Sequence, residues 1–230
     1  MIIHGLQKMT VLDFPGKIAC TVFTAGCNLR CPFCHNARLV THPEAEDRTD
    51  EEEVLSYIYK RKGMLDGVCI TGGEPLLQPD IRAFLEKIKQ TGLLVKLDTN
   101  GCYPEKLSEL IDAGLVDYVA MDIKNSPKEY GKTVGIENFD TADISRSIEI
   151  LKEGKVDYEF RTTVSRELHT KESLRAAAEW IAPAKRWFLQ SFVDSGDLIE
   201  GSFSAHSKDF MKELQTELSQ IVENVEMRGI

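Results

Sequence analysis

The sequence predicts an α/β fold around a parallel sheet, and three observations support this. Apolar, β-branched segments alternate with segments of helical periodicity six times along the 230 residues. Alternation at this spacing is typical of parallel strands joined by right-handed helical crossovers. No Pro-, Gly- or Ser-rich linker divides the chain, so residues 1–230 are expected to form one domain.

The first half of the chain supplies three strand–helix units after a lead over residues 1–17. β-Branched and apolar runs predict strands at residues 18–24, 67–71 and 94–99. Helical periodicity predicts helices at residues 49–62, 79–90 and 105–113. Thr49 and Asp50 can cap the first of these helices, and Gly92 and Gly114 end the other two.

The second half of the chain continues the alternation after a polar, aperiodic stretch at 124–139. Apolar runs predict strands at residues 118–123, 158–164 and 186–193. Helices are expected at residues 141–153 and 170–181, and a terminal helix within 204–230 that runs to about residue 225. Six units are two short of an eight-stranded barrel, so the pattern alone leaves a partial barrel and a doubly wound sheet as alternatives.

The charge balance and the N-terminus exclude several classes of partner. With 28 Lys and Arg against 37 Asp and Glu, the net charge is −9, so neither nucleic acid nor an anionic membrane is expected as a partner. No apolar run reaches the ~18 residues of a membrane span. Residues 1–5 lack the basic and apolar regions of a signal peptide, which predicts a cytoplasmic protein with reduced thiols.

Three of the six cysteines, Cys27, Cys31 and Cys34, lie within eight residues directly after the first predicted strand. Their spacing permits three sites: covalent haem, a zinc ion that also uses His35, or a [4Fe–4S] cluster. Covalent haem leaves Cys27 unexplained, and adjacent Cys34 and His35 would ligate one tetrahedral ion with difficulty. We therefore favour a cluster held by three thiolates, whose fourth iron has no protein ligand.

Polar residues also occur where the later strands end, the edge at which parallel folds place their active sites. Gly72 and Gly73 allow a ligand to approach the backbone, and Glu74 can accept a hydrogen bond from an ammonium group. An arginine in a central strand predicts a buried anion as partner, either a ligand carboxylate or an aspartate. The remaining candidates at these strand ends are Asp98, Asp122, Lys124 and Arg161.

The cysteine motif, with the aromatic Phe33 before its last cysteine, resembles that of the radical S-adenosylmethionine (SAM) superfamily. The resemblance implies a partial (β/α)6 TIM-like barrel in which SAM chelates the fourth iron of the cluster. It also implies reductive cleavage of SAM to a 5′-deoxyadenosyl radical. The residues Gly72, Gly73 and Glu74 are similar to the superfamily motif that holds the amino group of SAM.

Across nearly the whole chain the sequence resembles the activases of glycyl-radical enzymes. The resemblance rests on residues 10–17, 34–36, 98–101, 122–124 and 130–135, and is greatest to activators of anaerobic ribonucleoside-triphosphate reductase. It implies a monovalent cation beside SAM, surrounded by Asp98, Asp122 and the backbone near Ala120. It further implies that Lys124 lies near the reacting centre, that Arg161 contacts SAM and that Asp13 lies at the mouth of the site.

The resemblance implies two partners: a glycyl-radical enzyme, with anaerobic ribonucleotide reductase favoured, and a flavodoxin- or ferredoxin-type electron donor. We expect the stretch 124–139 to contact the enzyme partner. Two departures from the pyruvate formate-lyase branch leave the substrate protein open, namely Phe14 in place of Gly and the absence of His from 190–193. The alternatives are a radical SAM enzyme acting on a small molecule, such as a 7-deazapurine-forming enzyme, and a non-enzymatic iron–sulfur or zinc binding module.

Overall fold

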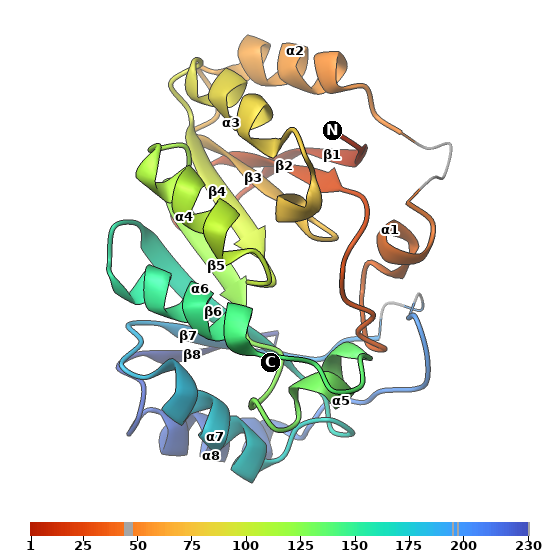
Figure 1. Cartoon of the computed structure of the whole chain (residues 1–230), viewed down its shortest axis with the longest axis vertical. Coiled ribbons are helices and arrows are strands. Elements are labelled where there is room, and N and C mark those ends of the chain that lie inside the picture. The colour runs from red at the N-terminus through yellow and green to blue at the C-terminus, as the bar shows by residue number, and fades with distance from the viewer. Residues whose placement is uncertain (44–47, 195, 197, 230) are drawn as a thin grey trace.

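Eight strands form one curved sheet in the computed structural model, which describes residues 1–43, 48–194, 196 and 198–229 (Figure 1). The order of the strands in the sheet is their order in the sequence. β1 runs antiparallel to β2, and every later neighbouring pair is parallel. The strands are β1 Ile3–Thr10, β2 Ala19–Thr24, β3 Gly67–Gly72, β4 Leu94–Thr99, β5 Tyr118–Asp122, β6 Asp157–Val164, β7 Trp187–Ser191 and β8 Val225–Arg228.

Six longer helices lie along the outer side of the sheet, and the short α1 and α5 lie beside the carboxyl ends of the strands (Figure 1). The longer helices are α2 Glu51–Arg61, α3 Ile81–Lys89, α4 Pro104–Asp112, α6 Ala142–Lys152, α7 Lys171–Ile181 and α8 Lys208–Leu218. The short ones are α1 Ala37–Thr41, α5 Tyr130–Val134 and the 3-10 turn η1 Pro75–Leu77.

The predicted partial barrel is confirmed, because all six expected strands are present as β2 to β7. No pairing among the described residues joins β8 back to β1, so the sheet curves without closing. Strands such as β3 are buried on both faces, as parallel strands covered by helices must be. None of the described helices is long and apolar enough to cross a membrane.

Two strands were not predicted, and both lie at the edges of the sheet. The lead contains β1, whose middle is half-exposed and lacks the apolar run expected of a buried strand. The terminal helix is shorter than predicted, because α8 ends at Leu218 and β8 follows. The apolar residues Ile221, Val222 and Val225 continue the helical spacing past Leu218, so the pattern concealed a strand of only four residues.

The helix ends are fixed by local hydrogen bonds in two of the crossovers. The Asp50 side chain accepts from the backbone N–H of Glu52 at the start of α2, as the sequence predicted. Thr170 and Ser173 exchange side-chain and backbone hydrogen bonds in a capping box at the start of α7. These caps set where each helix begins after the loop that leads away from the carboxyl end of its strand.

Candidate active site

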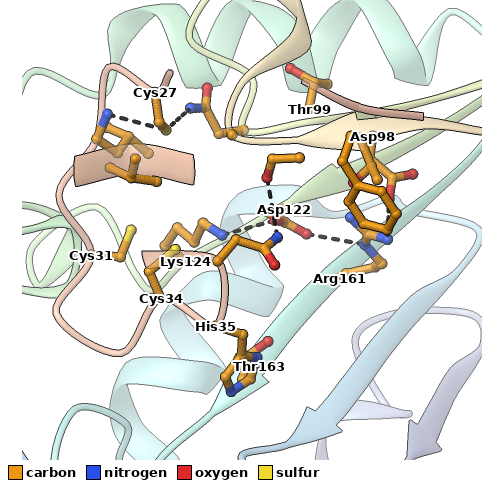
Figure 2. A pocket seen from close by; sticks show the side chains of 18 of the residues that line it. Cys27, Cys31, Cys34, His35, Asp98, Thr99, Asp122, Lys124, Arg161 and Thr163 are labelled. Atoms are coloured by element: carbon orange, nitrogen blue, oxygen red, sulfur yellow. Dashed lines mark hydrogen bonds and ion pairs between the residues drawn. The ribbon is translucent and has the colours of Figure 1, made fainter. Parts of the chain in front are cut away.

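A cavity of about 390 Å³ opens at the carboxyl ends of the strands (Figure 2). It is bounded by the loop after β2 and by the ends of β3, β4, β5 and β6. The structure therefore brings together residues that are widely separated in the sequence. Eleven of the predicted site residues line it: Asp13, Cys27, Cys31, Phe33, Cys34, Gly72, Gly73, Asp98, Asp122, Lys124 and Arg161.

The cysteine loop, residues 25–36, is held by backbone hydrogen bonds on both sides. The Gly26 N–H donates to the carbonyl of Leu39 at 2.8 Å, and the Arg30 N–H donates to the carbonyl of Val134 at 3.0 Å. Within the loop, the Cys34 N–H donates to the Cys31 carbonyl at 3.0 Å, which forms a tight turn. The thiols therefore project from a backbone whose course is set by α1 and α5.

All six cysteines are free thiols, and burial raises the pKa of Cys27 to about 11 and that of Cys31 to about 12. A metal that binds them must therefore displace protons. Cys31 and Cys34 lie beside each other, whereas Cys27 lies apart from them and contacts the Asn100 amide at 3.8 Å (Figure 2).

The arrangement of these thiols fits a cluster better than a single ion. Among the residues that the structure describes, no three His, Cys, Asp or Glu side chains are gathered closely enough to hold one metal ion. A [4Fe–4S] cluster binds each thiolate through a different iron and so needs its ligands spread around a shared space. Three thiols around one cavity meet that requirement.

Two aromatic side chains form the wall beside the cysteines. Phe33 is buried, and its ring meets those of His169 and Phe203 edge-on, with centroids 6.2 and 6.0 Å apart. His35 stacks on Phe192 at 5.2 Å, and its Nε2 atom is buried without a hydrogen-bond partner. His169 is 1% exposed, and its Nε2 bonds to the Lys124 carbonyl at 2.8 Å.

The glycine turn at the end of β3 is joined directly to the cysteine loop. The Gly73 N–H donates to the Thr24 carbonyl at 2.9 Å, and the Glu74 N–H donates to the Gly26 carbonyl at 2.8 Å. A Cβ atom on Gly73 would lie 2.0 Å from the carbonyl oxygen of Gly26, and this contact is with backbone. Only glycine therefore permits this approach.

We expect Gly73→Ala to lower the free energy of unfolding by about 1–3 kcal/mol, because the methyl group forces two backbone segments apart. Gly63→Ala is the matched control: its Cβ would meet nothing within 4 Å, so its stability should stay the same or rise slightly. Urea unfolding of both variants measures the difference. Equal midpoints for Gly73→Ala and the parent protein would contradict the tight approach.

Glu74 departs from its predicted role. It is fully buried and does not line the cavity: Oε1 accepts from the Leu76 N–H and the Thr99 hydroxyl at 3.0 and 2.9 Å, and Oε2 accepts from the Asn100 N–H at 2.7 Å. Burial raises its pKa to about 7. The carboxylate thus joins the loops after β3 and β4, and of this motif Gly72 and Gly73 line the cavity.

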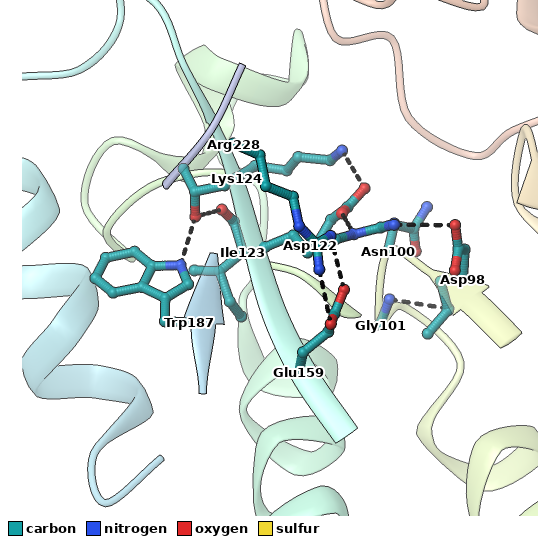
Figure 3. A network of polar contacts seen from close by, with 12 residues as sticks. Asp98, Asn100, Gly101, Asp122, Ile123, Lys124, Glu159, Trp187 and Arg228 are labelled. Atoms are coloured by element: carbon teal, nitrogen blue, oxygen red, sulfur yellow. Dashed lines mark hydrogen bonds and ion pairs between the residues drawn. The ribbon is translucent and has the colours of Figure 1, made fainter. Parts of the chain in front are cut away.

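A row of alternating charges extends across β4, β5 and β6 beside Cys31 and Cys34 (Figures 2 and 3). Arg161 donates from Nε to Asp122 and from Nη1 to Asp98, each at 3.0 Å. Lys124 donates to the other Asp122 oxygen at 2.8 Å, and Lys96 donates to the other Asp98 oxygen. In this structure both aspartates are therefore the anionic partners of the buried arginine.

The charges in this row keep both aspartates ionised. Burial alone would raise the pKa of Asp122, but the charges of Lys124 and Arg161 outweigh it and lower the value to about 2. At Asp98 burial again favours a higher pKa, but the charges of Arg161 and Lys96 outweigh it and lower the pKa of this carboxyl group. Three cationic groups contact two carboxylates, so each carboxylate in the row is paired with two cations.

A second ion pair lies next to this row and includes the unpredicted strand β8. Glu159 is fully buried and receives two hydrogen bonds from Arg228, at 3.1 and 3.2 Å (Figure 3). The Tyr118 hydroxyl donates a third hydrogen bond to this carboxylate at 2.8 Å. Lys96, Glu159 and Arg228 were not predicted from the sequence. Lys96 could have been found, because it precedes Asp98 by two residues and so shares its strand face.

Asp13 and the stretch 124–139 complete the site. Asp13 lines the cavity from the loop between β1 and β2, and it accepts from the Thr21 hydroxyl at 2.5 Å. The stretch 124–139, expected to touch a partner, is buried at its centre, where Tyr130 is 0% exposed and Val134 bonds to the cysteine loop. The end of α5 therefore supports the cysteine loop, whereas other positions of the stretch, such as Lys128 and Lys132, are exposed.

Comparison with known proteins identifies the family. The family model of the Radical SAM superfamily matches residues 21–181, more than two thirds of the chain. The chain belongs to the radical SAM superfamily. Membership implies a [4Fe–4S] cluster and SAM as cofactors, and the three free thiols around the cavity fit such a cluster.

Relatives within the radical SAM superfamily include activating enzymes. A protein of Methanocaldococcus jannaschii, provisionally named a glycyl-radical enzyme activating enzyme, is 28% identical over 236 residues, covering 100% of this chain and 96% of that protein. The pyruvate formate-lyase-activating enzyme of Listeria monocytogenes is 32% identical over 155 residues, covering 62% of this chain and 61% of that enzyme. The predicted resemblance to this group is thereby confirmed.

Solved radical SAM structures share the fold. A radical SAM methyltransferase from Sphaerobacter thermophilus superposes with a TM-score of 0.72 at 12% identity, covering 94% of this chain and 68% of that chain. At this identity the likeness concerns the arrangement of strands and helices alone. It agrees with the open parallel sheet described above.

Proposed function

We propose that this chain is an activase that generates a glycyl radical on anaerobic ribonucleoside-triphosphate reductase in the cytoplasm. When bound, the cluster and SAM supply reductive cleavage of SAM to methionine and a 5′-deoxyadenosyl radical, which abstracts a hydrogen atom from a glycine. A flavodoxin- or ferredoxin-type protein would supply the electron. The supporting observation is the similarity to an activating enzyme along the whole chain, together with a cysteine-lined cavity in an unclosed barrel.

The open side of the barrel supports a polypeptide substrate. A glycine in a folded partner can reach the cavity only as part of a loop, which needs access for main chain on both sides of the residue. The pairing in the described part of the chain leaves β1 and β8 as two free edges, so the barrel wall is interrupted there. Asp13 lies on the loop between β1 and β2, and we propose that it borders this entrance.

The charged row supports binding of an amino-acid moiety such as that of SAM. Arg161 and Lys124 line the cavity, and their cationic N–H groups suit the SAM carboxylate. The backbone of Gly72 and Gly73 lies on the cavity wall and offers carbonyl oxygens to the amino group. We assign Cys27, Cys31 and Cys34 to the cluster and Phe33 to the wall that shields it.

Anaerobic incubation of the reduced, reconstituted protein with SAM and anaerobic ribonucleotide reductase tests the proposal by electron paramagnetic resonance. We expect a glycyl-radical doublet on the reductase, and none when its radical glycine is replaced by alanine. Pyruvate formate-lyase serves as the comparison partner, and a doublet on that enzyme alone would overturn the choice of reductase.

A second outcome would remove the activase assignment altogether. If 5′-deoxyadenosine forms but no doublet develops on either protein, the radical is used elsewhere, as in an enzyme acting on a small molecule. If the chain binds iron or zinc but never cleaves SAM, it is a binding module.

A further inference from the structure

Lys96 is a lysine held inside the barrel. Its side chain is 2% exposed, it lies on β4 two residues before Asp98, and its ammonium group donates to the Oδ1 atom of that carboxylate. The ammonium group also contacts the Cys69 thiol at 3.8 Å. An ammonium group is costly to bury without a partner, so the lysine and the aspartate stabilise each other as a pair.

The lysine contacts Asp98 from below the ligand cavity. It lines a separate cavity of about 230 Å³ on the other side of the charged row, and it does not line the cavity that holds the cysteines. Asp98 and Arg161 line both cavities and so lie between them. Lys96 therefore reaches the ligand site through its ion pair with Asp98, and more weakly through Cys69, which also lines the cysteine cavity.

The carboxylates that the activase resemblance assigns to a monovalent cation are already paired. Asp98 binds Lys96 through one oxygen and Arg161 through the other. Asp122 binds Arg161 and Lys124 in the same way. The backbone there is also engaged, because Ala120 is fully buried in the sheet and pairs with the strand residues on both sides.

Charge also argues against an added ion. Three cationic side chains already contact the two carboxylates, so a potassium or sodium ion would bring a fourth positive charge into a largely buried row. It could bind only by displacing one of the amino or guanidinium groups. These residues do not fit a monovalent cation.

We infer that the Lys96 ammonium takes the place of the monovalent cation, as a fixed counter-charge that aims Asp98 at Arg161. Lys96 is thus a positioning residue: it holds the carboxylate, and the carboxylate orients the guanidinium toward the cavity. The inference rests on the proposed function only in placing SAM in that cavity.

The test compares potassium, sodium and choline as chloride salts at one ionic strength, since choline is too large for an ion site of this kind. For the unaltered protein, we expect the melting temperature without SAM and the SAM affinity of the cluster-loaded form to be the same in all three salts. A saturable gain in either quantity with potassium or sodium would overturn the inference.

Lys96→Met should make the SAM affinity depend on the cation of the salt, which we do not expect in the unaltered protein. In choline we expect its SAM affinity to fall roughly tenfold or more, and potassium or sodium to restore it as the ion enters beside Asp98. Its melting temperature should likewise be higher in the alkali salts. The control is Lys89→Met, which removes a lysine paired with Asp117 outside both cavities and should show no dependence on the cation.

A Lys96→Met protein that weakens SAM binding equally in all salts would show a purely structural lysine and overturn the inference. If that variant does not fold, the salt comparison on the unaltered protein still decides. If the unaltered protein binds no SAM in any salt, the proposed function fails. The melting temperatures in the three salts then still test whether Lys96 takes the place of the cation.

Discussion

Replacement of Cys31 by alanine should abolish SAM cleavage while leaving the fold intact. Loss of a residue that merely supports a metal ligand costs about 10–100-fold in affinity or activity, and loss of a ligand should exceed the upper figure. We expect the same for Cys27→Ala and Cys34→Ala, because the three thiols surround the same cavity. Iron and sulfide content, absorbance and 5′-deoxyadenosine formation measure the effect after anaerobic reconstitution.

The control for these variants is Cys20→Ala. Cys20 is fully buried in β2 and does not line the cavity, so its removal should leave iron content and SAM cleavage unchanged. Circular dichroism shows whether each variant is folded. Full iron loading and normal cleavage in Cys31→Ala would contradict the assignment of the cluster ligands, whereas loss of both in Cys20→Ala would point to general instability.

Replacement of Arg161 by methionine should destabilise the protein by about 3 kcal/mol, the lower end of the cost of breaking a buried ion pair. The variant leaves Asp98 and Asp122 close together with one lysine each, and both carboxylates are largely buried. For a chain of this size the melting temperature should fall by roughly 6–12 °C. SAM affinity should fall as well, because the guanidinium that faces the cavity is lost.

Arg161→Lys should recover little of this loss, since one ammonium group cannot reproduce bonds from Nε to one aspartate and from Nη1 to the other. Arg175→Met removes an exposed arginine that pairs with Glu179, and its stability should change by less than about 0.5 kcal/mol. Calorimetry of the three variants makes the comparison. If Arg161→Met has the same melting temperature as Arg175→Met, the row of alternating charges contributes no stability.

The sequence was sufficient to predict the parallel part of the sheet because β2 to β7 are buried runs followed by helices with clear periodicity. It was insufficient at both edges. Half of β1 faces outward, and β8 is too short for its alternation to be distinguished from the end of a helix. Edge strands are set by pairing with a neighbour, and a local pattern carries little of that information.

The candidate site was predictable to the extent that its residues follow strands. Cys27, Asp98 and Lys124 were found because strand ends converge in a parallel fold. Glu74 was expected to accept a hydrogen bond from an ammonium group of a ligand but lies buried outside the cavity lining, because sequence does not reveal which way a side chain turns after a glycine pair. Arg228 could not be found without β8, whose pairing with β7 brings it to Glu159.

The strand order has a consequence for how the chain folds. Because each strand pairs with the one before it, the sheet can grow by addition at one edge as the chain leaves the ribosome. Asp98 would then be enclosed well before Arg161 is available, since 63 positions separate the two. Lys96 lies on the same strand as Asp98, so the carboxylate has a counter-charge from the start and the half-built sheet need not bury a lone anion.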